Sequence, residues 1–220
     1  MLRLLICCLS LALVSCTTPL KKRNLLVIGD SNGAGQGWVY ELQKLRAGGP
    51  MVNTSLSGNT LGFTYEAGGL STNTLENLTS YLRKGYAEMG SIDEVLIALG
   101  TNDCKVEFAD RHTEIATNLT EVVDRTLAFF SERGQDQPRI VLLTPPPLND
   151  QDVVAQFRGA TACVEGVAAE VRSLAASRGY CLVDLHAKPG KKVLEYSKDG
   201  IHFSREGYEL IARAVVNSCY

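Results

Sequence analysis

The chain has 220 residues, of which 22 are basic and 24 are acidic, and it contains no long basic stripe. A protein that binds a phosphate backbone needs a clustered positive surface, so we expect no nucleic-acid partner. The length suits one α/β domain with a sizeable core, and no internal repeat or low-complexity tract divides the chain.

The first 23 residues resemble an export signal followed by a tether. After the basic start Met1-Leu2-Arg3, an apolar run is too short for a permanent membrane span. It ends in Leu13-Val14-Ser15-Cys16, which resembles a bacterial lipobox, so we expect residues 1–15 to be removed and Cys16 to be lipidated. Residues 16–23 then form the tether of a domain at 24–220. This predicts a lipoprotein of the bacterial cell envelope, anchored to a membrane and facing the periplasm or the exterior; the alternative is an ordinary secretory signal with a chance cysteine.

From residue 24 onward, apolar runs alternate with segments of helical spacing. A continuous apolar run such as 24–29 predicts a strand that is buried on both faces, as in a parallel sheet. The predicted strands are 24–29, 51–53, 94–99, 139–144 and 180–184. The predicted helices are 38–45, 73–84, 114–133, 156–178 and 204–217. This order predicts an α/β domain with a parallel sheet, right-handed crossovers and helices on both faces.

Three short polar motifs come after predicted strands. They are Gly29-Asp30-Ser31, Ser57-Gly58-Asn59 and Gly100-Thr101-Asn102-Asp103. In such a sheet, ligands bind outside the carboxyl ends of the strands, so the three motifs are expected to meet at one crevice. There Gly58 offers a backbone N–H and Asn102 a side-chain amide to a developing oxyanion. We expect the remaining acids, Asp30 and Asp103, to hold loop backbones.

Asp199-Gly200-Ile201-His202, close to the C-terminus, adds the groups that would activate a serine. A serine hydroxyl is a weak nucleophile until an imidazole takes its proton, and the imidazole needs an acceptor on its other nitrogen. Ser31 as nucleophile, His202 as base and Asp199 as orienting carboxylate fit these roles. The two histidines outside the motifs, His112 and His186, are expected to be ordinary surface or satisfied residues.

In this order the motifs resemble the four blocks of the SGNH or GDSL hydrolase family, over residues 24 to 216. The resemblance implies a flavodoxin-like three-layer α/β/α fold with a central parallel five-stranded sheet. It also implies Ser31, Asp199 and His202 as catalytic residues, with oxyanion donors from the Ser31 and Gly58 N–H groups and the Asn102 side chain. No cofactor or metal is required. The sequence departs from the family at Asn32, where many members have leucine, which affects the expected lining of the acyl pocket.

Two other motif assignments for the glycine-rich segment that begins at Gly29 fit less well. Gly29-Asp30-Ser31-Asn32-Gly33 satisfies the G-x-S-x-G nucleophile elbow of α/β-hydrolases. In that fold several strands precede the elbow, whereas here Ser31 follows the first strand. Neither G-x-G-x-x-G nor G-x-x-x-x-G-K-[ST] can be laid on the glycines at 29, 33, 35 and 37, so nucleotide binding is not expected.

The sequence thus predicts a serine ester hydrolase that acts on carboxylic esters, and we favour short acyl or acetyl groups, as on a polysaccharide. Alternatives are acyl or acetyl transfer to a glycan hydroxyl, lysophospholipase or thioesterase activity, and a glycan-binding module with a disabled site. The segment 61–71, with Phe63 and Tyr65, is expected at the pocket rim; Trp38 could join it or belong to the core.

The cysteines of the domain are Cys104, Cys163, Cys181 and Cys219. They lack zinc spacing, and in an oxidising compartment they could form two disulfides in three pairings. We expect at least one disulfide among them.

Overall fold

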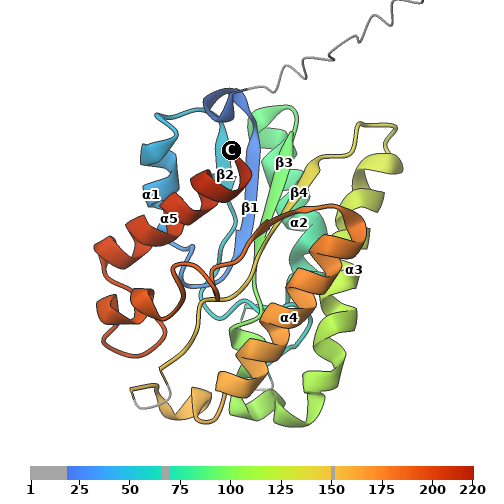
Figure 1. Cartoon of the computed structure of the whole chain (residues 1–220). Coiled ribbons are helices and arrows are strands. Elements are labelled where there is room, and N and C mark those ends of the chain that lie inside the picture. The colour runs from blue at the N-terminus through green and yellow to red at the C-terminus, as the bar shows by residue number, and fades with distance from the viewer. Residues whose placement is uncertain (1–18, 66–69, 150–151) are drawn as a thin grey trace, which may run out of the picture.

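The computed structural model describes residues 19–65, 70–149 and 152–220, and in them five parallel strands form one sheet (Figure 1). The strands are β1 (Leu25–Gly29), β2 (Met51–Asn53), β3 (Glu94–Ala98), β4 (Arg139–Leu143) and β5 (Cys181–Val183). Their order across the sheet is β2-β1-β3-β4-β5. The chain therefore reverses its direction of travel across the sheet after β2, which makes the carboxyl ends of β1 and β3 the switch point where a ligand crevice is expected. The predicted five-stranded parallel sheet is confirmed.

Helices cover both faces of this sheet, as the alternation of elements predicted. One face carries α1 (Trp38–Leu45) and α5 (Arg205–Cys219), and the other carries α2 (Thr74–Met89), α3 (Ile115–Ser131) and α4 (Thr161–Arg178). Because side chains alternate along a strand, Leu25 and Val27 pack in the core under α1 and α5, while Leu26 and Ile28 pack in the core on the opposite face. This double burial explains why β1 is a continuous apolar run.

Every predicted strand and helix is present, and the largest differences lie at helix ends. Helix α2 runs on to Met89 and stops at Gly90, whose φ of 77° gives the left-handed C-cap that glycine tolerates best. Helix α4 begins at Thr161, five residues later than predicted, because a separate 3-10 turn, η4 (Ala155–Phe157), precedes it. Another 3-10 segment, η3 (Val106–Glu114), leads into α3.

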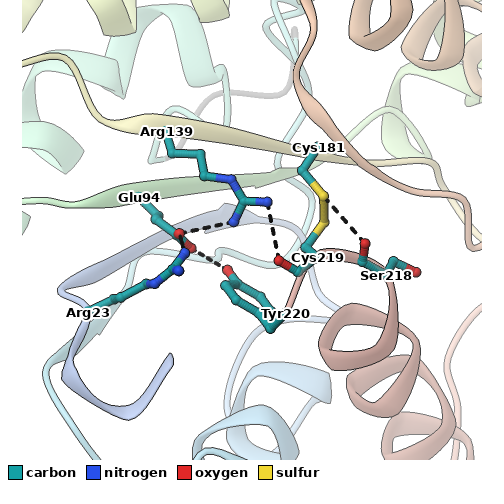
Figure 2. The surroundings of a disulfide bond; sticks show 7 residues. All are labelled: Arg23, Glu94, Arg139, Cys181, Ser218, Cys219 and Tyr220. Carbon is teal, nitrogen blue, oxygen red and sulfur yellow. Dashed lines mark hydrogen bonds and ion pairs between the residues drawn. A yellow bond between two sulfur atoms is a disulfide. The ribbon is translucent and has the colours of Figure 1, made fainter. Parts of the chain in front are cut away.

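Two disulfides join the four cysteines of the domain, which confirms the expected oxidation and selects one pairing. Cys104–Cys163 connects the 3-10 turn η2 (Asn102–Cys104) to α4. Cys181–Cys219 connects the start of β5 to the last residue of α5 (Figure 2). The first bridge therefore lies beside the loop after β3, and the second lies at the amino end of the sheet.

The export signal and Cys16 lie outside the described residues. Part of the expected tether is not free chain: the 3-10 turn η1 (Leu20–Lys22) and Arg23 pack against the domain. The Arg46 guanidinium donates to the carbonyls of Leu20 at 2.8 Å and Arg23 at 2.6 Å. In the part of the chain that the structure describes, no helix combines the length and the apolar character that a membrane span requires.

Candidate active site

Ser31, His202 and Asp199 form one hydrogen-bonded line at the carboxyl end of the sheet. Ser31 lies in the turn after β1, and the other two lie in the loop between the 3-10 segment η5 (Gly190–Tyr196) and α5. His202 Nε2 is 2.9 Å from Ser31 Oγ, and His202 Nδ1 is 2.7 Å from Asp199 Oδ2. The fold therefore brings together residues that are 171 positions apart in the chain.

Asp199 is fixed by the loop that carries it. Its Oδ1 accepts the backbone N–H groups of Ile201 at 3.0 Å and His202 at 2.7 Å. Partial burial raises the pKa of the Asp199 carboxyl, but the hydrogen bonds from the His202 ring and from these two N–H groups outweigh it, so the pKa is lowered overall. The carboxylate is thus ionised and can only accept hydrogen bonds, so the proton sits on His202 Nδ1. The lone pair of Nε2 consequently faces the Ser31 hydroxyl.

The two remaining oxyanion candidates are tied to the same end of β1. The Asn102 side chain donates from Nδ2 to the Asn59 carbonyl at 3.0 Å, and Asn59 Nδ2 donates to the Gly29 carbonyl at 3.0 Å. A primary amide carries two N–H donors, so one Asn102 donor holds the loop and the second is left for another acceptor. Gly58, just before Asn59, has a φ of 86°, a conformation for which glycine is suited. The three loop motifs therefore meet at one place, as their positions after strands predicted.

Asp30 and Asp103 hold loop backbones, as expected from the sequence. Asp30 Oδ1 accepts the Asn32 N–H at 2.9 Å, and both oxygens of Asp103 accept the Leu61 N–H, at 2.9 and 3.0 Å. Burial raises the pKa of Asp30 to about 6 and that of Asp103 to about 7, although these hydrogen bonds act in the opposite direction. Two carboxyl groups with raised pKa values thus hold the loops around Ser31 and Asn102.

The structure also places the residues around the expected pocket. Trp38 and Phe63 are buried in the two cores, at 2% and 0% exposure, so the expectation that Phe63 lies at the rim is wrong. Tyr65 does line a cavity. Asn32 is buried as well, and its Oδ1 accepts the Tyr208 hydroxyl of α5 at 3.2 Å. The asparagine that departs from the family pattern therefore has a partner inside the protein.

A cavity of about 490 Å³ opens beside Gly58. Most of its lining side chains carry hydroxyl, amide or charged groups, and they include Ser57, Thr64, Tyr65, Lys105, Glu107 and Gln156. The volume lies within the range of small-molecule sites, roughly 300–1,000 Å³. A group rich in hydroxyls would find both hydrogen-bond donors and acceptors on these walls.

Several residues with structural roles in the site had no role assigned from the sequence. Asn59 is fully buried and links the loops after β1 and β3. The Thr101 side chain partly opposes the rise in the pKa of the Asp30 carboxyl. Their positions inside the polar motifs were the available signal, but only the folded chain shows which group each one contacts. Within residues 19–65, 70–149 and 152–220, no three His, Cys, Asp or Glu side chains gather in a way that could hold a metal ion.

Comparison with known proteins gives one family and a set of similar folds. The model of the GDSL-like lipase/acylhydrolase family matches residues 27–210. No curated protein sequence matches the chain. Among solved structures, a carbohydrate acetylesterase from Sinorhizobium meliloti superposes with a TM-score of 0.69 and 22% identity, covering 89% of this chain and 97% of that one.

Two further structures have the same fold. The aryl esterase of M. smegmatis has a TM-score of 0.70 and 23% identity, over 89% of this chain and 97% of that one. A GDSL-like lipase from Bacteroides thetaiotaomicron has a TM-score of 0.64 and 18% identity, over 90% and 87% of the two chains. At these identities the likeness concerns the fold, with its central parallel sheet and flanking helices, and not the substrate.

Proposed function

The chain belongs to the GDSL-like lipase/acylhydrolase family, and from this premise we propose that it hydrolyses carboxylic esters through an acyl-serine intermediate. The observation that carries the proposal is the unbroken line from Asp199 through His202 to Ser31, with contacts of 2.7 and 2.9 Å. Nucleophile, base and orienting carboxylate within hydrogen-bond reach form the arrangement that activates a serine hydroxyl.

In the proposed mechanism Ser31 Oγ attacks the carbonyl carbon of the ester while His202 Nε2 takes its proton. The tetrahedral oxyanion accepts hydrogen bonds from the Ser31 and Gly58 N–H groups and from the second amide N–H of Asn102. Collapse of this intermediate breaks the bond to the leaving alcohol, which takes the proton from His202. Water then attacks the acyl-serine by the same steps and releases the acid, so Ser31 is restored.

We favour hydrolysis over acyl transfer because the catalytic base and its orienting carboxylate are exposed to solvent. The side chains of His202 and Asp199 are 47% and 39% exposed, so water has direct access to the base. A transferase must keep water from its acyl-enzyme, and no such shield covers these two described side chains. Adding an alcohol acceptor such as glycerol to the assay and measuring acylated glycerol against free acid tests this choice.

For the substrate we propose a short acyl group, such as acetyl, on a hydroxyl-rich alcohol of carbohydrate type. The hydroxyl, amide and charged groups among the side chains that line the cavity beside Gly58 support this substrate, because they offer hydrogen bonds that a lipid chain could not use. Solved structures with this fold include proteins described as carbohydrate acetylesterases and aryl esterases. Lysophospholipid and thioester substrates, which need a long apolar groove or a thiol carrier, fit these walls less well.

A fluorophosphonate probe and a panel of esters test the activity. The probe should label Ser31 in the wild type and should label nothing in Ser31→Ala. Turnover should be highest for p-nitrophenyl acetate, fall towards the palmitate ester, and extend to acetylated xylan. Absence of both labelling and turnover in the wild type would favour a glycan-binding module with a disabled site.

We also propose that Cys16 carries a lipid anchor in the cell envelope, because the motif before it resembles a lipobox. Only three residues, 17–19, separate that cysteine from the η1 turn that packs on the domain. Cys16→Ser should therefore move the full chain from the membrane fraction to the soluble fraction. Membrane retention of the variant would contradict the anchor without bearing on the esterase activity.

A further inference from the structure

A chain of hydrogen bonds runs from the cavity wall to the loop that carries Gly58. The Lys105 ammonium donates to the Tyr65 hydroxyl at 3.0 Å, and this hydroxyl donates to the Gly58 carbonyl at 2.8 Å. Lysine has donors only, so the Tyr65 oxygen must accept from Lys105 and turn its own proton towards Gly58. The direction of both bonds is thereby fixed.

The Tyr65 hydroxyl is also held in its protonated form. Burial, followed by the nearby carboxylates of Glu107 and Asp103, raises its pKa above the ordinary value. Half-burial lowers the pKa of Lys105, and Glu107 partly opposes this shift. The cation also lies 4.6 Å from the centre of the Tyr65 ring, so the two side chains are packed together as well as hydrogen-bonded.

The bond to Gly58 acts on a residue whose backbone no side chain restricts. Glycine lacks the Cβ that restricts rotation, and Gly58 has a φ of 86°. Its N–H and its carbonyl belong to the two peptide planes that meet at its Cα, so a fixed carbonyl limits the directions that the N–H can take. The next carbonyl along the chain, that of Asn59, accepts the Asn102 amide at 3.0 Å. The Tyr65 hydroxyl thus binds the residue that carries one expected oxyanion donor, the Gly58 N–H. The residue after Gly58 is Asn59, whose carbonyl holds the Asn102 amide, the other expected donor.

We propose that Tyr65, supported by Lys105, is a positioning residue that fixes the Gly58 N–H in the direction of the oxyanion. The proposal rests on the ester hydrolysis proposed above, because it assigns Tyr65 to the same site. Stabilisation of a developing charge depends on donors that are aligned before the reaction, so a looser Gly58 should slow the chemical step and leave ground-state binding nearly unchanged.

The competing role for Tyr65 is packing alone. Its ring lies 5.2 Å from that of Phe108, a contact that a phenylalanine at position 65 would keep. Tyr65→Phe therefore removes the hydroxyl and leaves the aromatic packing. Tyr86→Phe in α2 is the matched control, since it deletes a hydroxyl from a surface-exposed ring outside the loops of the site.

The test measures kcat and KM on p-nitrophenyl acetate together with inhibition by a boronic acid, which forms a tetrahedral anion on the serine. For Tyr65→Phe we expect kcat to fall about tenfold, the inhibition constant to rise by a similar factor, and KM to stay within about twofold. Lys105→Met should lower kcat about threefold, because Tyr65 keeps its own bond to Gly58 but loses its orienting donor. Tyr86→Phe should match the wild type in all three quantities.

Either of two kinetic results would overturn the inference while the wild type remains an esterase. One is a Tyr65→Phe enzyme with wild-type kcat. The other is a loss of kcat without a matching change in boronate inhibition, which would indicate a role outside the oxyanion site. A melting temperature close to that of the wild type is expected, and a large drop in it together with a raised KM would show that Tyr65 is structural. An inactive wild type with no fluorophosphonate labelling would instead reject the proposed function itself.

Discussion

The two ends of the central sheet treat buried carboxylates in opposite ways. At the amino end, Glu94 at the start of β3 is 2% exposed and accepts from Arg23, Arg139 and the Tyr220 hydroxyl (Figure 2). At the carboxyl end, Asp30 and Asp103 accept hydrogen bonds from backbone N–H groups, and burial raises their pKa values to about 6 and 7. The first arrangement pairs the charge with cations, whereas in the second the cost of desolvation outweighs the hydrogen bonds that oppose it.

The two ends also differ in their cross-links. Near the amino end, where both described termini lie, are the Cys181–Cys219 bridge, the Arg46 hydrogen bonds to the backbone of residues 20–23 and the contacts of Glu94. Cys104–Cys163 lies instead beside the loop that carries Asn102. The amino end thus gathers cross-links between distant segments, while the carboxyl end holds buried polar groups whose alignment is expected to cost stability. Variants at the two ends should therefore separate stability from rate.

The largest effect is expected at the carboxyl end, from Asn102→Ala. Its free amide N–H would contact charge that exists in the tetrahedral intermediate and hardly in the ester, so kcat should fall and KM should change only a few-fold. Removal of one such donor lowers kcat by roughly 10² to 10³, or about 2.7 to 4 kcal/mol. Steady-state kinetics on p-nitrophenyl acetate measure it.

Asn102→Asp should be at least as slow, because an ionised carboxylate repels the developing negative charge. A folded Asn102→Ala enzyme with nearly full kcat would show that this residue only holds the loop through Asn59. That result would contradict the expected difference between the two ends, in which polar groups at the carboxyl end serve the catalytic rate.

The disulfides give a direct comparison of the two ends. Replacing either pair by serines should lower the free energy of unfolding by about 2–4 kcal/mol. Loss of Cys104–Cys163 should also lower kcat several-fold, because Cys104 closes the η2 turn that begins with Asn102. Loss of Cys181–Cys219 should leave kcat unchanged. Urea unfolding and kcat of the two double variants decide this, and equal kcat values would disprove the link to the site.

Glu94→Gln should lower the stability of the protein without lowering kcat. The amide keeps the shape of the side chain but loses the charge that two arginines share, which we expect to lower the free energy of unfolding by about 2 kcal/mol. The control is Glu132→Gln, whose side chain is 74% exposed and lies 4.0 Å from Arg133, so little change is expected. If Glu94→Gln unfolds like the control, the buried cluster adds nothing to stability.

The last expected effect is a change in the pH dependence of stability. A carboxyl whose pKa is raised in the folded state binds its proton more tightly there than in the unfolded chain, so its contribution to stability is present below its ordinary pKa of 3.8. For Asp103 this contribution is lost as the pH rises to about 7. Asp103→Asn removes the titration, so the variant should gain melting temperature relative to the wild type between pH 4 and about 8.

Asp136→Asn, at an exposed position, should show no such gain. A constant difference between Asp103→Asn and the wild type across this pH range would mean that Asp103 is ionised throughout. The contrast with the paired Glu94 would then be weaker than the raised pKa values indicate.

The sequence alone determined the order of elements and the chemistry of the motifs. Continuous apolar runs such as β1 can only be stable when both faces are covered, which is why the parallel sheet could be predicted from 24–29 and its counterparts. Ser31, Asp199 and His202 could be named because each motif supplies a distinct chemical role, and the structure places them in hydrogen-bond contact.

The tertiary structure decided what depends on contacts between distant segments. Cysteine spacing allowed three pairings, and only packing of β5 against the end of α5 selects Cys181–Cys219. Likewise, Phe63 and Tyr65 lie two residues apart in one loop, yet one is in the core and the other binds Gly58. Local pattern sets the periodicity of an element and the reactivity of a side chain. Burial and hydrogen-bond partners arise only when residues far apart in the chain are brought together.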